Sequence, residues 1–303
     1  MRKCNVITIC LPELYDTLPE KNLERSVALL DSFKTLKPDL ICLPETFLEI
    51  SVNVPRDFKQ LADMCFPVLS GKARELNSYI VAGVHEIIDG KTYNSAWLIN
   101  RGGNLAGRYI KYYPVDYELT RTNVVPGSEV PVFETDFGKL GILICFDIDF
   151  PRIWTEMGKK GAEIVAWISA YDGGYPLNAY AAINDYYVVS SVRAYHSRII
   201  DKSGKELAIS SRWANWAQRS IGLDKTLFHI DGQFPKLNNI QKQLGDKITL
   251  ETFDEEGRFT IESNDPEWPV ERVRNEFGLK TFAEFHEKIE VMLEEHRHDY
   301  MKG

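Results

Sequence analysis

The stretch Gly138-Lys-Leu-Gly-Ile-Leu-Ile-Cys-Phe-Asp-Ile-Asp-Phe-Pro-Arg152 places one cysteine at the end of an apolar strand. Leu140 to Ile144 form a short apolar run, and the segment after Cys145 is irregular and polar. Short apolar runs bounded in this way are typical of strands inside a sheet that is covered on both faces. The pattern therefore predicts a thiol that is held rigidly at a strand end and still meets solvent.

Two other polar side chains follow apolar strands in the same way. Glu45 comes after Leu40-Ile-Cys-Leu-Pro44, and Lys111 comes after Leu105-Ala-Gly-Arg-Tyr-Ile110. A free cysteine is mostly protonated at neutral pH, so a catalytic one needs a base or a nearby cation. A carboxylate can take the thiol proton, and an ammonium group, helped by a backbone N–H such as that of Phe146, can stabilise an oxyanion. Together these residues supply a nucleophile, a base and a cation.

Strands and helices alternate along most of the chain. We expect strands at 6–10, 40–43, 79–85, 130–134, 140–144, 163–168 and 186–192, helices at 20–36, 56–77, 152–160 and 177–185, and β meanders near 85–110 and 196–230. Such alternation predicts a layered α/β architecture, and the β-rich stretches indicate a mixed sheet or two sheets packed together. Helices are expected on the outer faces.

The C-terminal part reads differently from the rest. We expect a catalytic domain at 1–232 and a continuation with a C-terminal extension at 233–303. The extension begins with a polar linker at 233–247, followed by a hairpin at 248–261 and an amphipathic helix at 281–299. That helix has an apolar face, so it is expected to pack on its own domain or on a second subunit.

Composition excludes several classes of function. The net charge of -8 and the pI near 5.4 argue against nucleic-acid binding, which needs a basic surface. No apolar run reaches the ~18 residues that span a bilayer, and Met1-Arg-Lys-Cys-Asn5 leads directly into a strand, so we expect a cytoplasmic protein that binds no membrane. The five cysteines lack CxxC spacing, which predicts reduced thiols and neither a disulfide framework nor a zinc site.

Three blocks of sequence carry a resemblance to a known family. They are Leu43-Pro-Glu-Thr-Phe47, Gly107-Arg-Tyr-Ile-Lys-Tyr-Tyr-Pro114 and Leu143-Ile-Cys-Phe-Asp-Ile-Asp-Phe-Pro151. In this order they resemble the signature blocks of the nitrilase superfamily of carbon-nitrogen hydrolases, over roughly residues 4–230. The resemblance implies a four-layer αββα sandwich, a triad of Glu45, Lys111 and Cys145, a homodimer or larger homo-oligomer, and no metal or organic cofactor.

The family also uses a second glutamate after the lysine. Glu118, seven residues after Lys111, is the best match, and Asp116 and Glu129 are weaker alternatives. The run Trp167-Ile-Ser-Ala-Tyr-Asp172 resembles the segment that lines the substrate pocket. Phe146, Tyr171 and Asp172 are therefore candidates for substrate contact, although buried aromatic packing of Tyr171 is an open alternative.

The residues after the cysteine bear on the branch of the family. Phe146-Asp147 resembles the amidase and carbamoylase branches, whereas nitrile-hydrolysing members usually have Trp-Glu there. Those branches often continue with an arginine and end in Phe-Pro-Glu, but here Asp149 and Arg152 stand at these positions with the signs reversed. Either the two form the same local ion pair with its partners exchanged, or the pocket has lost a cation for a substrate carboxylate.

The predicted function is cysteine-dependent hydrolysis of a small amide or N-carbamoyl compound. It would proceed through a thioester acyl-enzyme and release ammonia or an amine. A nitrilase or acyltransferase of the same superfamily, and a catalytically silent binding or assembly member, are the alternatives. In every case the expected ligand is a small molecule.

Overall fold

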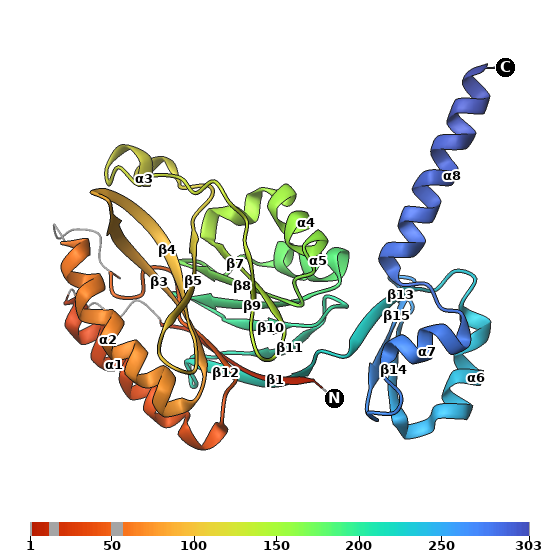
Figure 1. Ribbon diagram of the computed structural model, residues 1–303, viewed down its shortest axis with the longest axis horizontal. Coiled ribbons are helices and arrows are strands. Elements are labelled where there is room, and N and C mark those ends of the chain that lie inside the picture. Colours follow the sequence, from red (N-terminus) through yellow and green to blue (C-terminus); the bar gives the residue numbers. More distant parts are fainter. Residues whose placement is uncertain (1, 12–17, 50–56, 303) are drawn as a thin grey trace. The chain divides into compact units, whose positions relative to one another are not determined.

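The chain folds into a larger unit, Cys4–Ile221, and a smaller unit made of Gly222–Gly303 with Met1–Lys3. The structure is a computed structural model that describes residues 2–11, 18–49 and 57–302 (Figure 1). Both units combine strands with helices. The predicted linker at 233–247 is wrong, because most of it forms a helix.

The elements have the following bounds. The strands of the larger unit are β1 (Lys3–Ile9), β2 (Leu40–Cys42), β3 (Tyr79–Ile88), β4 (Lys91–Ile99), β5 (Leu105–Ile110), β6 (Val132–Glu134), β7 (Lys139–Ile144), β8 (Ile164–Ser169), β9 (Tyr187–Val192), β10 (Arg198–Ile200), β11 (Glu206–Ile209) and β12 (Trp216–Gly222). Its helices are α1 (Pro19–Ser32), α2 (Phe58–Leu76), α3 (Asp116–Thr120), α4 (Pro151–Lys159) and α5 (Tyr175–Asn184), with 3₁₀ turns at Lys34–Leu36 and Cys145–Asp149. The smaller unit has β13 (Lys225–His229), β14 (Ile248–Phe253), β15 (Arg258–Ser263), α6 (Phe234–Leu244), a 3₁₀ turn at Gly245–Lys247, α7 (Val270–Phe277) and α8 (Phe282–Lys302).

Two six-stranded mixed sheets form the larger unit. Their strand orders are β12-β1-β2-β3-β4-β5 and β11-β10-β9-β8-β7-β6. Strands β1, β2 and β3 run parallel, as do β7, β8 and β9, and the outer strands β4 to β6 and β10 to β11 are antiparallel to their neighbours. Of these parallel strands, β2, β8 and β9 are buried at every residue and are mostly apolar, as expected for strands covered on both faces.

The two sheets lie face to face. The buried Ser191 hydroxyl of β9 shares its proton between the carbonyls of Ile9 (2.8 Å) and Cys42 (2.9 Å) at the facing sheet. Helices α1 and α2 cover the outer face of one sheet, with Leu30 and Leu69 buried against it, and α4 and α5 cover the other sheet (Figure 1). This arrangement confirms the four-layer αββα sandwich expected from the resemblance.

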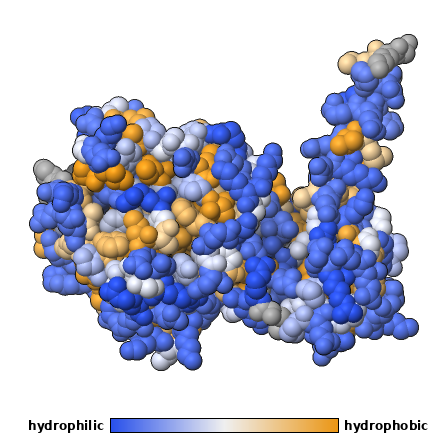
Figure 2. Space-filling model, viewed as in Figure 1, coloured by the Kyte–Doolittle hydropathy of each residue, from blue (hydrophilic) through white to orange (hydrophobic). Residues whose placement is uncertain are grey.

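The smaller unit contains a three-stranded antiparallel sheet in the order β13-β15-β14. Leu237, Ile240 and Leu244 of α6 are buried in its apolar cluster, so the stretch that reads as polar in sequence has a helical apolar face. Helix α8 buries Phe282 at its start, whereas Val291 and Leu293 are exposed on its mostly hydrophilic surface (Figure 2). None of the described helices is long and apolar enough to cross a membrane.

Candidate active site

Glu45 is held in a tight turn after β2. The next residue, Thr46, has a φ of 40°, and Glu45 itself is only 4% exposed. Gly83 of β3 lies against this turn, and a Cβ at Gly83 would stand 2.5 Å from the Glu45 Cα. Only glycine permits this close approach, so the sequence of β3 fixes the position of the carboxylate.

Lys111 is fixed from two sides at the end of β5. Its N–H donates to the Asn94 carbonyl (2.9 Å), and its carbonyl accepts from the Gly127 N–H (2.8 Å). A Cβ at Gly127 would stand 2.3 Å from the Ile110 oxygen, so the loop can approach the strand only because residue 127 is glycine. The Lys111 side chain is 1% exposed and is therefore directed into the interior.

Two carboxylates share the Lys111 ammonium group. Nζ lies 2.9 Å from Glu45 Oε1 and 2.7 Å from Glu118 Oε2. The Asn94 amide bridges the same pair, donating to Glu45 Oε1 (2.9 Å) and to Glu118 Oε1 (2.5 Å). The structure thus brings together Glu45, Lys111 and Glu118, and it adds Asn94, which the sequence did not single out.

The weaker alternatives to Glu118 lie elsewhere. Glu118 is buried in the first turn of α3, where its Oε2 also accepts from the Val115 N–H (2.8 Å). Asp116, in the same turn, is exposed, and Glu129 is exposed in the loop before β6. Of the three candidates, Glu118 is the one that contacts Lys111.

Cys145 stands at the first position of the 3₁₀ turn that follows β7. Its φ of 47° lies in the left-handed region, which costs a non-glycine residue on the order of 1–3 kcal/mol. The Trp167 indole N–H donates to the Cys145 carbonyl (3.0 Å) and helps to hold the turn. The side chain is 9% exposed, more than the other four cysteines, all of which are free.

The surroundings of the site shift the pKa values of Glu45 and Cys145 in opposite directions. Burial raises the pKa of Glu45, but Lys111 and Arg193 outweigh this effect and lower it to about 2. Burial and the Glu45 charge raise the pKa of the Cys145 thiol to about 12, against the opposing effects of Lys111 and of hydrogen bonds from Ser169 and Ala170. At neutral pH an ionised carboxylate therefore stands near a protonated thiol.

Lys111 stays charged in this environment. Burial alone would lower its pKa, but the charges of Glu45 and Glu118 raise it above its ordinary value. A buried ammonium group with two carboxylate partners is compensated electrostatically and keeps a fixed orientation. It can therefore serve as a permanent cation beside the thiol.

The three residues predicted to contact substrate occupy different surroundings. Phe146 is half-buried and packs edge-on against Phe150, with ring centroids 5.4 Å apart. Tyr171 is 41% exposed, its ring packs edge-on against Trp167 with ring centroids 5.6 Å apart, and burial raises the pKa of its hydroxyl. Asp172 lies 3.5 Å from an Arg198 nitrogen, so its carboxylate already has a cationic partner.

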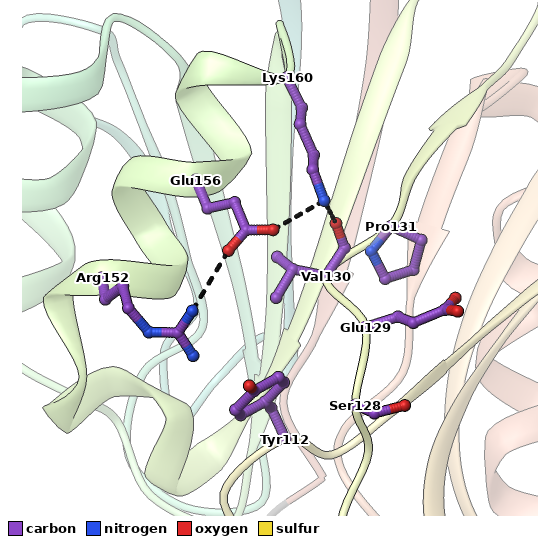
Figure 3. A pocket seen from close by; sticks show the side chains of 8 residues that line it. All are labelled: Tyr112, Ser128, Glu129, Val130, Pro131, Arg152, Glu156 and Lys160. Atoms are coloured by element: carbon purple, nitrogen blue, oxygen red, sulfur yellow. Dashed lines mark hydrogen bonds and ion pairs between the residues drawn. The ribbon is translucent and has the colours of Figure 1, made fainter.

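The local ion pair between Asp149 and Arg152 does not form, so that prediction is wrong. Arg152 lies 3.6 Å from Glu156 on the next turn of α4, and its guanidinium donates to the Tyr113 hydroxyl (3.2 Å). Figure 3 shows Arg152 and Glu156 lining a pocket of about 280 Å³ beside the loop that carries Glu129. Asp149 is exposed, its charge contributes to the raised pKa of Tyr171, and it has no charged partner among the described residues.

Arg193 is a cation of the site that the sequence did not single out. It follows β9, its N–H donates to the Ser169 carbonyl (3.1 Å), and its charge lowers the pKa of Glu45. One guanidinium nitrogen donates to the Glu49 carbonyl (3.4 Å), while the buried Nε has no hydrogen-bond partner in the described part of the chain. Its place just after a buried strand is the same signal that indicated Glu45 and Cys145.

Comparisons with known proteins agree with this geometry. The family model of carbon-nitrogen hydrolases matches residues 6–225. The omega-amidase NIT3 of Saccharomyces cerevisiae is 27% identical over 67% of this chain and 82% of its own. The deaminated glutathione amidase of Synechocystis is 28% identical over 72% of this chain and 92% of its own.

A solved structure shows the same fold. The amidase of Nesterenkonia sp. AN1 superposes with a TM-score of 0.63 at 18% identity, over 72% of this chain and 89% of that one. That structure is of a glutamate-to-glutamine mutant of the amidase, in which the acetamide moiety of fluoroacetamide is covalently added at the active site cysteine. The family match covers most of the chain and includes all three signature blocks, which confirms the resemblance. The chain belongs to the carbon-nitrogen hydrolase family of the nitrilase superfamily.

Proposed function

We propose that this protein is a cysteine amidohydrolase that cleaves a small amide or N-carbamoyl compound and releases ammonia or an amine. The observation that carries the proposal is the shared Lys111 ammonium group, 2.9 Å from Glu45 and 2.7 Å from Glu118, beside the strained Cys145 turn. The residues of this site all lie within the larger unit, Cys4–Ile221. We assign catalysis to residues 1–232 and an accessory role to the extension at 233–303.

Glu45 is the general base in the first half of the reaction. With a pKa of about 2 it is ionised, and the Cys145 thiol with a pKa of about 12 is protonated, so free thiolate is scarce. The proton passes from Sγ to the Glu45 carboxylate as Sγ attacks the carbonyl carbon. The carbonyl oxygen becomes an oxyanion, which the Lys111 ammonium group and a backbone N–H such as that of Phe146 stabilise.

Collapse of the tetrahedral intermediate breaks the C–N bond. Glu45 returns its proton to the departing nitrogen, ammonia or an amine leaves, and a thioester remains on Cys145. Water then gives a proton to Glu45 and adds to the thioester carbonyl. Expulsion of the thiolate, which recovers that proton, frees the acid. Glu118 and Asn94 hold Lys111 and Glu45 in place throughout.

The substrate class follows from the surroundings of the thiol and from the relatives. The relatives named above are amidases, which favours an amide over a nitrile. We assign Phe146, Tyr171 and Asp172 to substrate contact, Tyr171 because it packs against Trp167, whose indole N–H donates to the Cys145 carbonyl. The residues after Cys145 lack a cation for a substrate anion, and Arg193 supplies that cation.

We also infer a homodimer or larger homo-oligomer. Helix α8 exposes Met292 and Leu293, which are 41% and 46% accessible and share one face with the partly buried Ile289, three and four residues earlier. An isolated helix gains little stability in water, so a partner for this face is favourable. Light scattering on the purified full chain would detect the assembly, and a monomer at micromolar concentration would contradict the inference.

Ammonia release over a panel of small amides, N-carbamoyl compounds and nitriles tests the activity. We expect release from at least one amide or carbamoyl compound by the wild type and none above background by Cys145→Ala. Cys65→Ala is the matched control, because Cys65 is a buried thiol on α2 outside the site. Equal release by the wild type and Cys145→Ala would remove Cys145 from the mechanism.

A further inference from the structure

Asp147 is a buried carboxylate that the proposed reaction does not use. Its side chain is inaccessible to solvent and accepts three hydrogen bonds. The Tyr109 hydroxyl (2.7 Å) and the Ile144 N–H (2.9 Å) donate to Oδ2, and the Tyr113 N–H (2.9 Å) donates to Oδ1. Burying a carboxylate is costly, so a fully buried and fully hydrogen-bonded one has a structural or functional reason.

The three donors come from the two segments that carry Lys111 and Cys145. Tyr109 precedes Lys111 by two residues on β5, and Tyr113 follows it by two. Ile144 directly precedes Cys145, whose backbone is in the left-handed region. The Asp147 carboxylate therefore ties the nucleophile turn to the strand end of the ammonium group.

We propose that Asp147 is a positioning residue that locks the Cys145 turn onto the Lys111 strand end. This proposal depends on the proposed function only for its kinetic readout. Without the three hydrogen bonds, the strained turn would relax and Sγ would shift relative to Glu45 and Lys111. Displacement of reacting groups by about 1 Å costs on the order of 100-fold in rate.

The lock requires the ionised form of Asp147. All three partners are donors, so a protonated carboxyl group would direct its own O–H at one of them. Burial raises the pKa of Asp147 to about 7, in opposition to its hydrogen bonds and to the Lys111 charge. The lock is therefore formed above about pH 7 and weakens as the pH falls below that value.

Other titratable groups face Asp147 but do not account for a transition near pH 7. Burial and the Asp147 charge raise the pKa of Tyr109, so it stays protonated there. Near pH 7, Lys111 stays charged and the Cys145 thiol stays protonated. Arg152 on α4, which contacts the Tyr113 hydroxyl, also stays charged. Glu45, with a pKa of about 2, is ionised throughout.

The test compares the full chain with Asp147→Asn and Tyr109→Phe. In the wild type, kcat/KM for an amide that the enzyme hydrolyses should decrease as the pH is lowered below about 7, because this ratio reports the pKa values of the groups in the free enzyme. Asp147→Asn should not show this decrease, the acidic limb of the pH profile, and its kcat should be about 100-fold lower with little change in KM. Tyr109→Phe removes a hydrogen bond that stabilises the carboxylate, so its limb should move to higher pH.

Tyr186→Phe is the matched control for Tyr109→Phe, because Tyr186 is also a fully buried tyrosine, and its hydroxyl donates to the Trp154 carbonyl instead (3.3 Å). Its limb should match that of the wild type. The proposal is overturned if folded Asp147→Asn keeps the limb and a kcat within twofold of the wild type. If Asp147→Asn does not fold, an unshifted limb in Tyr109→Phe overturns it.

A second readout is independent of amide hydrolysis. The rate at which iodoacetamide modifies Cys145, followed by mass spectrometry, should show an inflection near pH 7 in the wild type and none in Asp147→Asn. If no amide is hydrolysed but this inflection appears, the proposed function fails and the positioning role stands. If amides are hydrolysed and neither profile depends on Asp147, the positioning role alone fails.

Discussion

Replacement of Glu118 by glutamine tests the part of the site that carries most of its charge. Glu118→Gln preserves the shape of the side chain but removes the charge 2.7 Å from the Lys111 ammonium group. The new amide would also direct donors at the Asn94 amide or at the Val115 N–H, both of which donate to Glu118 in the wild type. Lys111 would then keep Glu45 as its one charged partner in this cluster.

The magnitude follows from the hydrogen bonds that change. A hydrogen bond to a charged group contributes about 1.5–3 kcal/mol. If the whole contribution is lost from the transition state, kcat falls roughly 10- to 150-fold, since 1.36 kcal/mol corresponds to a factor of ten. KM should change little, because Glu118 binds Lys111 and is not expected to bind the substrate.

Steady-state kinetics on an amide substrate, with circular dichroism to verify folding, measures this effect. Asp116→Asn and Glu129→Gln are matched controls, because each removes one exposed carboxylate from the same region of the chain. Both controls should keep wild-type kcat. A folded Glu118→Gln with a kcat within twofold of the wild type would refute the role of Glu118 in holding Lys111.

Three further predictions concern stability and the thiol. Gly127→Ala should lower the free energy of unfolding by about 1–3 kcal/mol, because the new Cβ would stand 2.3 Å from the Ile110 oxygen. Gly71→Ala is the control, because open space surrounds Gly71 in α2, and thermal melts should show that it is neutral or stabilising. Alkylation of Cys145 in the free enzyme should keep accelerating up to at least pH 10, because its pKa is raised to about 12; a plateau at pH 7 would contradict this. Glu45 has a pKa of about 2 in the folded chain, so its ionised carboxylate should contribute roughly 3 kcal/mol of stability above pH 4.5, and this contribution is lost as the pH falls toward 2. When the free energy of unfolding is measured as a function of pH, Glu45→Gln should lose less stability in acid than the wild type.

Much of the site could be predicted because its chemistry stands at strand ends. Glu45 follows β2 and Cys145 follows β7, two interior strands of their sheets, and a continuous apolar run marks such strands in sequence. The signature blocks then indicated which strand ends belong together. Lys111 was predicted in the same way, from its place after an apolar strand, whereas Glu118 was predicted only from the resemblance.

The residues that sequence reasoning missed depend on contacts between distant segments. Asn94 lies within β4, and its amide reaches both carboxylates only because the register pairs Ser95 with Ile110, next to Lys111. No local pattern distinguishes it from an ordinary polar residue of a strand. Arg193 was visible as a strand-end cation, but its approach to Glu45 depends on how the two sheets face each other.

The errors outside the site have simple physical causes. The stretch 233–247 is rich in polar residues, but Leu237, Ile240 and Leu244 recur at helical spacing and bury one face of α6. Average polarity therefore concealed a helix that periodicity reveals. The expected pair of Asp149 and Arg152 failed because Arg152 lies within reach of Glu156 on its own helix.

The central claim is that Cys145 carries the acyl group, and mass spectrometry of enzyme quenched by acid during turnover tests it most directly. With a small amide such as butyramide as substrate, the peptide that contains Cys145 should become heavier by one acyl group. The label should be released by hydroxylamine and absent from Cys145→Ala. An acyl group on another residue, or turnover by Cys145→Ala at the wild-type rate, would contradict the claim.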